Sequence, residues 1–221
     1  MTRTRTITRT VTTSTVTLLL GGLCLAVGSS PAQAATTTSS TVSREAGADA
    51  VVTDYPAHGH PVPGRAYHDT IVSTAVSASR ADGTTTRGAF AWFASTTYSF
   101  DAAGTYVEGA QTSGYADGSA VRLLVDRALR TAHLRATVPA TTCDQGICTN
   151  VGPLRISVDW TATGAISHVA GRQRLHKGTT TVTSRTDGDS RTATAVATPF
   201  GRTATASLWR GTSRQRTVVR P

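Results

Sequence analysis

Residues 90–100 have the sequence FAWFASTTYSF, which carries the strongest strand pattern in the chain. Its even positions, among them Phe90, Trp92, Tyr98 and Phe100, form one largely aromatic face. Because side chains alternate between the two faces of a strand, the pattern predicts a β-strand. We interpret the aromatic face as core, since the chain has only 3 Trp, 5 Tyr and 4 Phe from which to build one. A platform that stacks sugar rings or bases is the alternative.

The same alternation recurs on either side of the quoted stretch. Residues 134–138 (LRATV) and 154–160 (LRISVDW) alternate apolar residues with Arg, Thr, Ser and Asp. This is typical of strands with one buried and one solvated face. Turn signals rich in Gly and Asp separate the strands, at 81–83, 101–104, 116–118, 163–164, 176–178 and 187–189.

Residues 121–134 (VRLLVDRALRTAHL) fit two templates. Val121, Leu124, Val125 and Ala128 have helical spacing, whereas 121–125 also alternate as a strand would. We favour two strands at 119–126 and 131–138, because the alternation continues to Val138.

These patterns predict an all-β protein with a single antiparallel sandwich or barrel of about nine or ten strands, arranged as a meander. The 42 threonines suit this fold, since β-branched side chains pack well on a pleated surface. We expect the β domain to span residues 67–221, with a frayed C-terminal tail. Residues 35–66 are small, polar and rich in Pro and Gly, which predicts a disordered or irregular leader.

The N-terminal segment is typical of a secretory signal peptide. Arg3, Arg5 and Arg9 precede an apolar run at 16–27, and residues 32–34 (AQA) form a small-x-small cleavage site. We therefore expect residues 1–34 to be removed, the mature chain to be secreted, and no transmembrane segment to remain. Cleavage lowers the formal net charge from +9 to +6.

Cleavage also removes Cys24 and leaves Cys143 and Cys148. An even number of cysteines in an exported protein predicts a disulfide. With four residues between the cysteines, its expected place is the tip of a hairpin.

The sequence offers few candidate catalytic or metal-binding residues. His58, His60 and His68 are weak candidates for a metal site, and we expect neither a metal nor a cofactor. No catalytic sequence motif is present, so we assign no catalytic residue and expect a non-catalytic protein. A secreted hydrolase or metal-dependent enzyme that uses the region of these three histidines is the alternative. Glu108 with either Asp117 or Asp126 stays open as a carboxylate pair for glycoside hydrolysis.

The positive charge is spread over positions that we expect to face outward. Arg172, Arg174 and Lys177 form a local concentration and are the candidate contacts to polyanions. No nucleic-acid-binding module accompanies them, so we expect no specific nucleic-acid partner. An exported basic protein meets anionic envelope polymers or polysaccharides instead. A third hypothesis is a protease inhibitor that presents the Cys143–Cys148 loop.

Residues 118–138 (GSAVRLLVDRALRTAHLRATV), the cysteine loop and residues 158–164 (VDWTATG) carry a resemblance. Over about residues 66–210, the chain resembles uncharacterised exported β-rich proteins of high-GC Gram-positive bacteria. The resemblance implies bacterial origin and secretion. It carries over no functional residue, because that group has no known activity.

Overall fold

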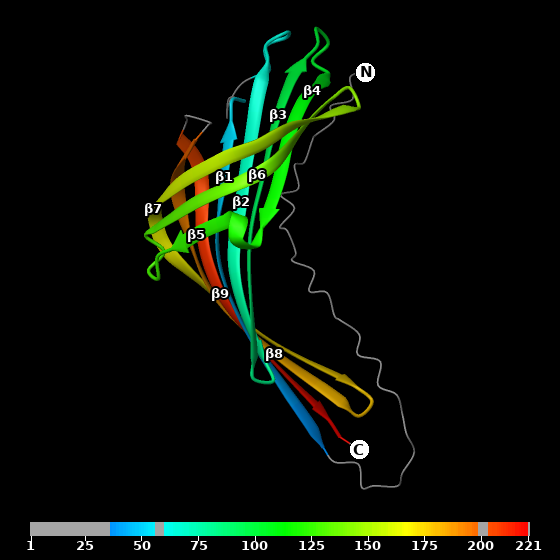
Figure 1. Cartoon of the computed structure of the whole chain (residues 1–221), viewed down its shortest axis with the longest axis vertical. Coiled ribbons are helices and arrows are strands. Elements are labelled where there is room, and N and C mark those ends of the chain that lie inside the picture. Colours follow the sequence, from blue (N-terminus) through cyan, green and yellow to red (C-terminus); the bar gives the residue numbers. More distant parts are fainter. Residues whose placement is uncertain (1–35, 56–59, 199–202, 221) are drawn as a thin grey trace, which may run out of the picture. The chain divides into compact units, whose positions relative to one another are not determined.

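The structure is a computed structural model that describes residues 36–55, 60–198 and 203–220. Nine strands make up almost all of these residues and confirm the predicted all-β class (Figure 1). Their bounds are β1 Thr37–Thr53, β2 Tyr67–Ala81, β3 Thr84–Phe100, β4 Tyr106–Asp117, β5 Val121–Val125, β6 Thr131–Asp144, β7 Ile147–Lys177, β8 Thr180–Thr198 and β9 Thr203–Val219. The described residues include no helix that is long and apolar enough to cross a membrane. The expected signal peptide, residues 1–34, lies outside them.

All nine strands belong to one antiparallel sheet in the order β4-β3-β2-β1-β9-β8-β7-β6-β5. Residues 111–114 of β4 also pair with residues 140–143 of β6. This pairing closes the meander into a ring, as expected for the predicted sandwich or barrel. Strands that follow each other in the chain are neighbours in the sheet, except β4 and β5. The pairing of β1 with β9 joins the first strand to the last one.

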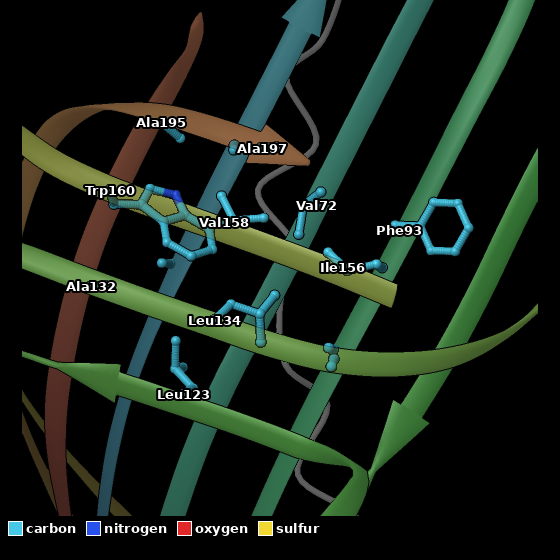
Figure 2. Close-up of a cluster of buried hydrophobic side chains, with 14 of the residues drawn as sticks. Val72, Phe93, Leu123, Ala132, Leu134, Ile156, Val158, Trp160, Ala195 and Ala197 are labelled. Atoms are coloured by element: carbon cyan, nitrogen blue, oxygen red, sulfur yellow. The ribbon is translucent and has the colours of Figure 1, made fainter. Parts of the chain in front are cut away.

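The core lies where the sheet folds over itself. In Figure 2, β5, β6 and β7 cross β1, β2, β3 and β9, and the side chains between the two layers are buried. The buried side chains of β7 are large, whereas β1, β8 and β9 contribute mainly alanine, which lets the layers interdigitate. The largest fully buried side chains in this cluster are Trp160, Phe93, Leu129, Leu134, Ile156, Leu208, Val72, Val138 and Val158.

Trp160 is the largest fully buried side chain of this core. Its side chain is fully buried, and its indole Nε1 donates a hydrogen bond to the backbone oxygen of Asp49 at 3.1 Å. Ala48, Ala50 and Ala195 are buried in the same cluster and leave room for the indole. A buried aromatic ring with a satisfied polar atom stabilises the packing of β7 on β1.

The ambiguous segment at 121–134 is a hairpin, as predicted. β5 pairs with β6, and the turn between them is capped by the Asp126 carboxylate, which accepts hydrogen bonds from the backbone N–H groups of Ala128 and Arg130. Leu129 has a positive φ of 52° in this turn and is fully buried. Its burial in the core explains why a bulky residue occupies this conformation.

The expectations about the chain ends are wrong in part, since the described residues 60–66 of the expected leader do lie outside any strand. Within the expected leader at 35–66, Thr37–Thr53 is β1, which pairs with both β2 and β9. Near the C-terminus, where we expect a frayed tail, Thr203–Val219 is β9, which pairs with β1 and β8. These segments lack a strong apolar pattern because their inner faces contribute mainly alanine to the core. Their order comes from strand pairing on both edges.

Two of the predicted turns are also wrong. Residues 163–164 lie within β7, where the pairing with β8 shifts between Ala162 and Ile166. The guanidinium Nε of Arg191 donates to the Gly164 oxygen at 2.5 Å and supports this irregularity. Residues 187–189 (DGD) lie in the middle of β8, where β7 and β9 flank them. Gly and Asp favour turns locally, but pairing on both sides overrides that preference.

The aromatic alternation at 90–100 is correct as a strand, but its interpretation as core holds only in part, since Ala94 and Tyr98 are buried whereas Trp92 is exposed. In the main core cluster, β3 is represented by the odd positions Ala91 and Phe93. The even positions lie on the opposite side, which we call the outer face. At one end of this face Tyr67 and Tyr98 are buried in an aromatic cluster, and the backbone N–H of Val62 donates to the Tyr67 hydroxyl at 2.8 Å.

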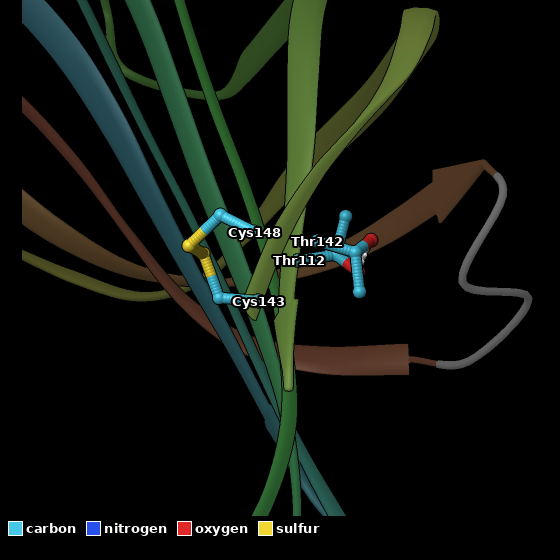
Figure 3. Close-up of a disulfide and its surroundings, with 4 residues drawn as sticks. All are labelled: Thr112, Thr142, Cys143 and Cys148. Carbon is cyan, nitrogen blue, oxygen red and sulfur yellow. Dashed lines mark hydrogen bonds between the residues drawn. A yellow bond between two sulfur atoms is a disulfide. The ribbon is translucent and has the colours of Figure 1, made fainter. Parts of the chain in front are cut away.

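The predicted disulfide is confirmed. Cys143 and Cys148 face each other across β6 and β7 at the tip of a two-residue turn (Figure 3). Gln145 and Gly146 have φ values of 46° and 82°, as a tight hairpin turn requires. Next to the disulfide, the Thr112 and Thr142 hydroxyls lie 2.7 Å apart where β4 pairs with β6. The disulfide therefore fixes the hairpin that closes the ring.

Candidate anion-binding surface

Arg172 and Arg174, two of the three residues predicted to contact polyanions, lie together in the second half of β7. Every residue from 165 to 177 is exposed. Because side chains alternate along a strand, Arg172 and Arg174 project from one face and Lys177 projects from the other. The face of Arg172 continues the inner face that holds Trp160 in the first half of the strand.

The neighbouring strands add arginines to this face. Arg172 lies directly opposite Arg185 of β8, which lies directly opposite Arg214 of β9. Residues opposite each other in an antiparallel pair project to the same side. Three guanidinium groups from three strands therefore stand in one row across the sheet.

Following the pairing into β1, β2 and β3 extends this row into a surface, which we call the arginine face. Within the described ranges it consists of Arg44, Arg80, Arg87, Arg172, Arg174, Arg185, Arg210, Arg214 and Arg216, all of them exposed. Two carboxylates, Asp187 and Asp189, share the face. Arg172, Arg174 and Arg185 are exposed, as predicted, and the arginines gather on the face that forms the core elsewhere.

This gathering of charge does not serve the stability of the sheet. Like charges directly opposite each other in a strand pair are destabilising. Within the part of the chain that the structure describes, no ion pair involves Arg172, Arg185 or Arg214. A bound anion would relieve this repulsion, because guanidinium groups hold carboxylate, phosphate and sulfate oxygens through paired N–H donors.

One arginine of the face is already neutralised. Arg210 donates from Nε and Nη2 to Asp189 Oδ2 at 2.9 and 2.5 Å, and His168 Nδ1 lies 2.9 Å from Asp189 Oδ1. The hydrogen bond to Asp189 and then the charge of Asp187 raise the pKa of His168. The hydrogen bonds from His168 and Arg210 lower the pKa of Asp189. His168 therefore adds positive charge to the face at mildly acidic pH.

The arginine face is hollowed next to the core. A cavity of about 670 Å³ lies there, and its lining includes Arg44, Arg87 and Arg210. The turn between β5 and β6 lines it as well, and Arg210 donates from Nη1 to the backbone oxygen of Arg127 in that turn. A smaller hollow of about 250 Å³ lies between Arg185, Asp187, Thr212 and Arg214. Both hollows offer arginine donors to a chain molecule lying across the sheet.

Among the described residues, the other candidates are not assembled into a site. His58 lies outside the described residues, His60 is exposed, and His68 Nδ1 lies 3.3 Å from the Thr97 hydroxyl. In the ranges described, no group of three or more His, Cys, Asp or Glu side chains could hold a metal ion. Of the open carboxylate pair, Asp126 caps the β5–β6 turn and Glu108 lies opposite Tyr98.

No protein-family model, no curated protein and no solved structure matches the chain. The candidate surface is therefore defined by the strand register and by the side chains that it aligns.

Sequence reasoning missed His168, Asp189 and Arg210 as members of one network. The Asp-Gly-Asp motif at 187–189 predicts a turn, which hides the position of Asp189 within β8. The sequence does contain a signal for the arginine face: one residue separates the two arginines in Arg172-Gln-Arg174 and in Arg214-Gln-Arg216. In a strand this spacing places both arginines of a pair on one face.

Proposed function

We propose that this protein is a secreted, non-catalytic protein that contacts anionic polymers of the cell envelope or of its surroundings. The row formed by Arg172, Arg185 and Arg214 carries the proposal, because these side chains repel one another and none is in an ion pair within the described residues. A polymer with regularly spaced phosphates, sulfates or carboxylates can cross several strands and contact several arginines at once.

The sequence supports the proposal that the protein is secreted. Residues 1–34 have the pattern of a cleaved export signal, and the Cys143–Cys148 disulfide is compatible with an oxidising compartment. The resemblance to exported proteins of high-GC Gram-positive bacteria agrees with an envelope polymer as partner.

The test is salt-dependent retention on immobilised polyphosphate and on heparin. A triple variant with Arg172→Gln, Arg185→Gln and Arg214→Gln should elute at lower salt than the wild type. Its slope of log affinity against log salt should fall by about one for each arginine removed.

A matched triple variant separates the arginine face from net charge. Arg122, Arg135 and Arg155 line a different hollow, on β5, β6 and β7, and Arg122 lies directly opposite Arg135. Their replacement by Gln therefore removes the same charge and also a pair of opposed arginines, but on the other face of the sheet. This control should retain most of the wild-type affinity. Equal losses in the two triple variants would show that only net charge matters and would refute the proposal.

A further inference from the structure

The exposed half of the outer face carries an aromatic platform that the polyanion proposal does not use. Trp92 on β3 lies directly opposite Tyr115 on β4, and their exposed fractions are 37% and 52%. The Phe90 ring stacks beside Tyr115 at a centroid distance of 6.4 Å and an interplanar angle of 14°. Phe90, Trp92 and Tyr115 therefore present adjacent aromatic surface to the solvent.

A fixed carboxylate lies in the same row as the platform. The strand register aligns Asp49 of β1, Ser73 of β2, Trp92 and Tyr115 across four strands. The Ser73 hydroxyl donates to Asp49 Oδ1 at 2.6 Å, and Trp209 Nε1 donates to Asp49 Oδ2 at 3.3 Å. A carboxylate has about four acceptor positions, so Asp49 can still accept hydrogen bonds from a ligand.

Close packing holds this carboxylate in place. The Trp209 ring lies against Gly47, where an added Cβ would collide with the ring. Asp49 lies two strands from Trp92, which corresponds to about 9 to 10 Å at the usual strand spacing. The row thus combines flat apolar surface at one end with fixed hydrogen-bond acceptors at the other.

The charge of the outer face selects against an anionic ligand. Asp117 lies opposite Phe90, and Glu45 and Asp49 project from the same side of β1. The arginine face lies on the reverse side of the same strands. A purely apolar partner fits poorly as well, because it would bury the Asp49 carboxylate without giving it hydrogen bonds.

We propose that Phe90, Trp92, Tyr115 and Asp49 form a binding site for a neutral polysaccharide. A pyranose ring has one face of C–H groups, which stack on an aromatic ring, and a rim of hydroxyls, which donate to a carboxylate. Trp92 and Tyr115 supply the stacking surface and Asp49 accepts from the hydroxyls. This site is independent of the arginine face.

The test is depletion of the full chain onto insoluble cellulose, chitin and starch in about 1 M NaCl, where the Debye length is about 3 Å and attraction to polyanions is screened. The wild type should bind at least one of these polysaccharides. Trp92→Ala and Tyr115→Ala should each weaken binding about tenfold, the size expected for loss of one stacking contact. Trp92→Phe should restore most of the affinity.

Two control variants establish whether binding depends on the platform. Leu124→Ala removes an apolar side chain that is 71% exposed on β5, and it should bind as the wild type does. The triple Arg172, Arg185 and Arg214 variant should also bind normally, whereas its loss of binding would assign the polysaccharide to the arginine face. Absence of wild-type binding to all three polysaccharides would overturn the proposal. So would a wild-type dimer that Trp92→Ala converts to a monomer, because the platform would then be an interface between copies.

Discussion

The two halves of β7 have the same residue alternation and opposite environments. In the first half, Ile156, Val158 and Trp160 are at most 2% exposed. In the second half, the same inner face carries His168, Arg172 and Arg174, and all three are exposed. Figure 1 shows the reason, since the first half of β7 crosses over β1, β2 and β3, whereas its second half runs beside β8 within the sheet.

The comparison shows that alternation predicts a strand and its two faces, but not which face is covered. Where a second layer crosses, the inner face excludes water and carries large apolar residues. Where the layer ends, the same face is solvated, and charge becomes compatible with it. The core and the arginine face are therefore successive segments of one surface, and the β5–β6 turn lies at their boundary.

The largest expected effect is a difference in stability between two variants, one with a substitution in each half of β7. Trp160→Ala should lower the free energy of unfolding by about 3–5 kcal/mol, because it leaves a cavity between the layers. Leu175→Ala, at a residue that is 57% exposed in the second half, should change it by no more than about 0.5 kcal/mol. Urea unfolding of both variants measures the difference. Similar losses would contradict the division of β7 into a covered and an uncovered half.

A smaller effect of opposite sign is expected at Arg185. Arg185→Thr should raise the free energy of unfolding slightly, on the order of a few tenths of a kcal/mol, because Arg172 and Arg214 no longer face a like charge. The same substitution should reduce retention on polyphosphate. Urea unfolding measures the change in stability, and elution in a salt gradient measures the change in retention. A lower stability of this variant would argue against repulsion across the row.

The smallest expected effect is a pH dependence at His168. Its pKa is raised, so the stabilisation from its pair with Asp189 is complete below its ordinary value of 6.5 and is lost as pH rises through the raised value. The pKa of Asp189 is lowered, so that carboxylate contributes above 3.8 and stops contributing only as pH falls through the lowered value. His168→Gln should therefore be less stable than the wild type near about pH 5 and nearly equal near about pH 9. Urea midpoints across this range measure it, and a difference that does not vary with pH would exclude the ion pair.

Part of the fold followed from local patterns. The strands around 90–100, 134–138 and 154–160, the β5–β6 hairpin and the hairpin disulfide all depend on contacts between residues near in sequence. The predictions failed where distant pairing dominates. Thr37–Thr53 is ordered only because β2 and β9 flank it, and Gly188 continues a strand because β7 and β9 hold it on both sides.

For the candidate sites, the sequence supplied residue types but not their partners. It indicated Arg172 and Arg174, and it raised a stacking platform as one interpretation of the aromatic alternation. Only the register of β7, β8 and β9 aligned Arg185 and Arg214 with Arg172. Likewise, only the pairing of β1 to β4 placed Asp49 in the row of Trp92 and Tyr115.

The sequence by itself determined the all-β class, the strand alternation, the cysteine pair and the excess of basic residues, because each depends on local spacing or on composition. The tertiary structure decided which face of each strand meets a second layer. That choice depends on where the sheet crosses itself, which is set by the packing of residues far apart in the chain. It made Phe93 core and Trp92 surface, although the two are adjacent, and it turned scattered arginines into one face.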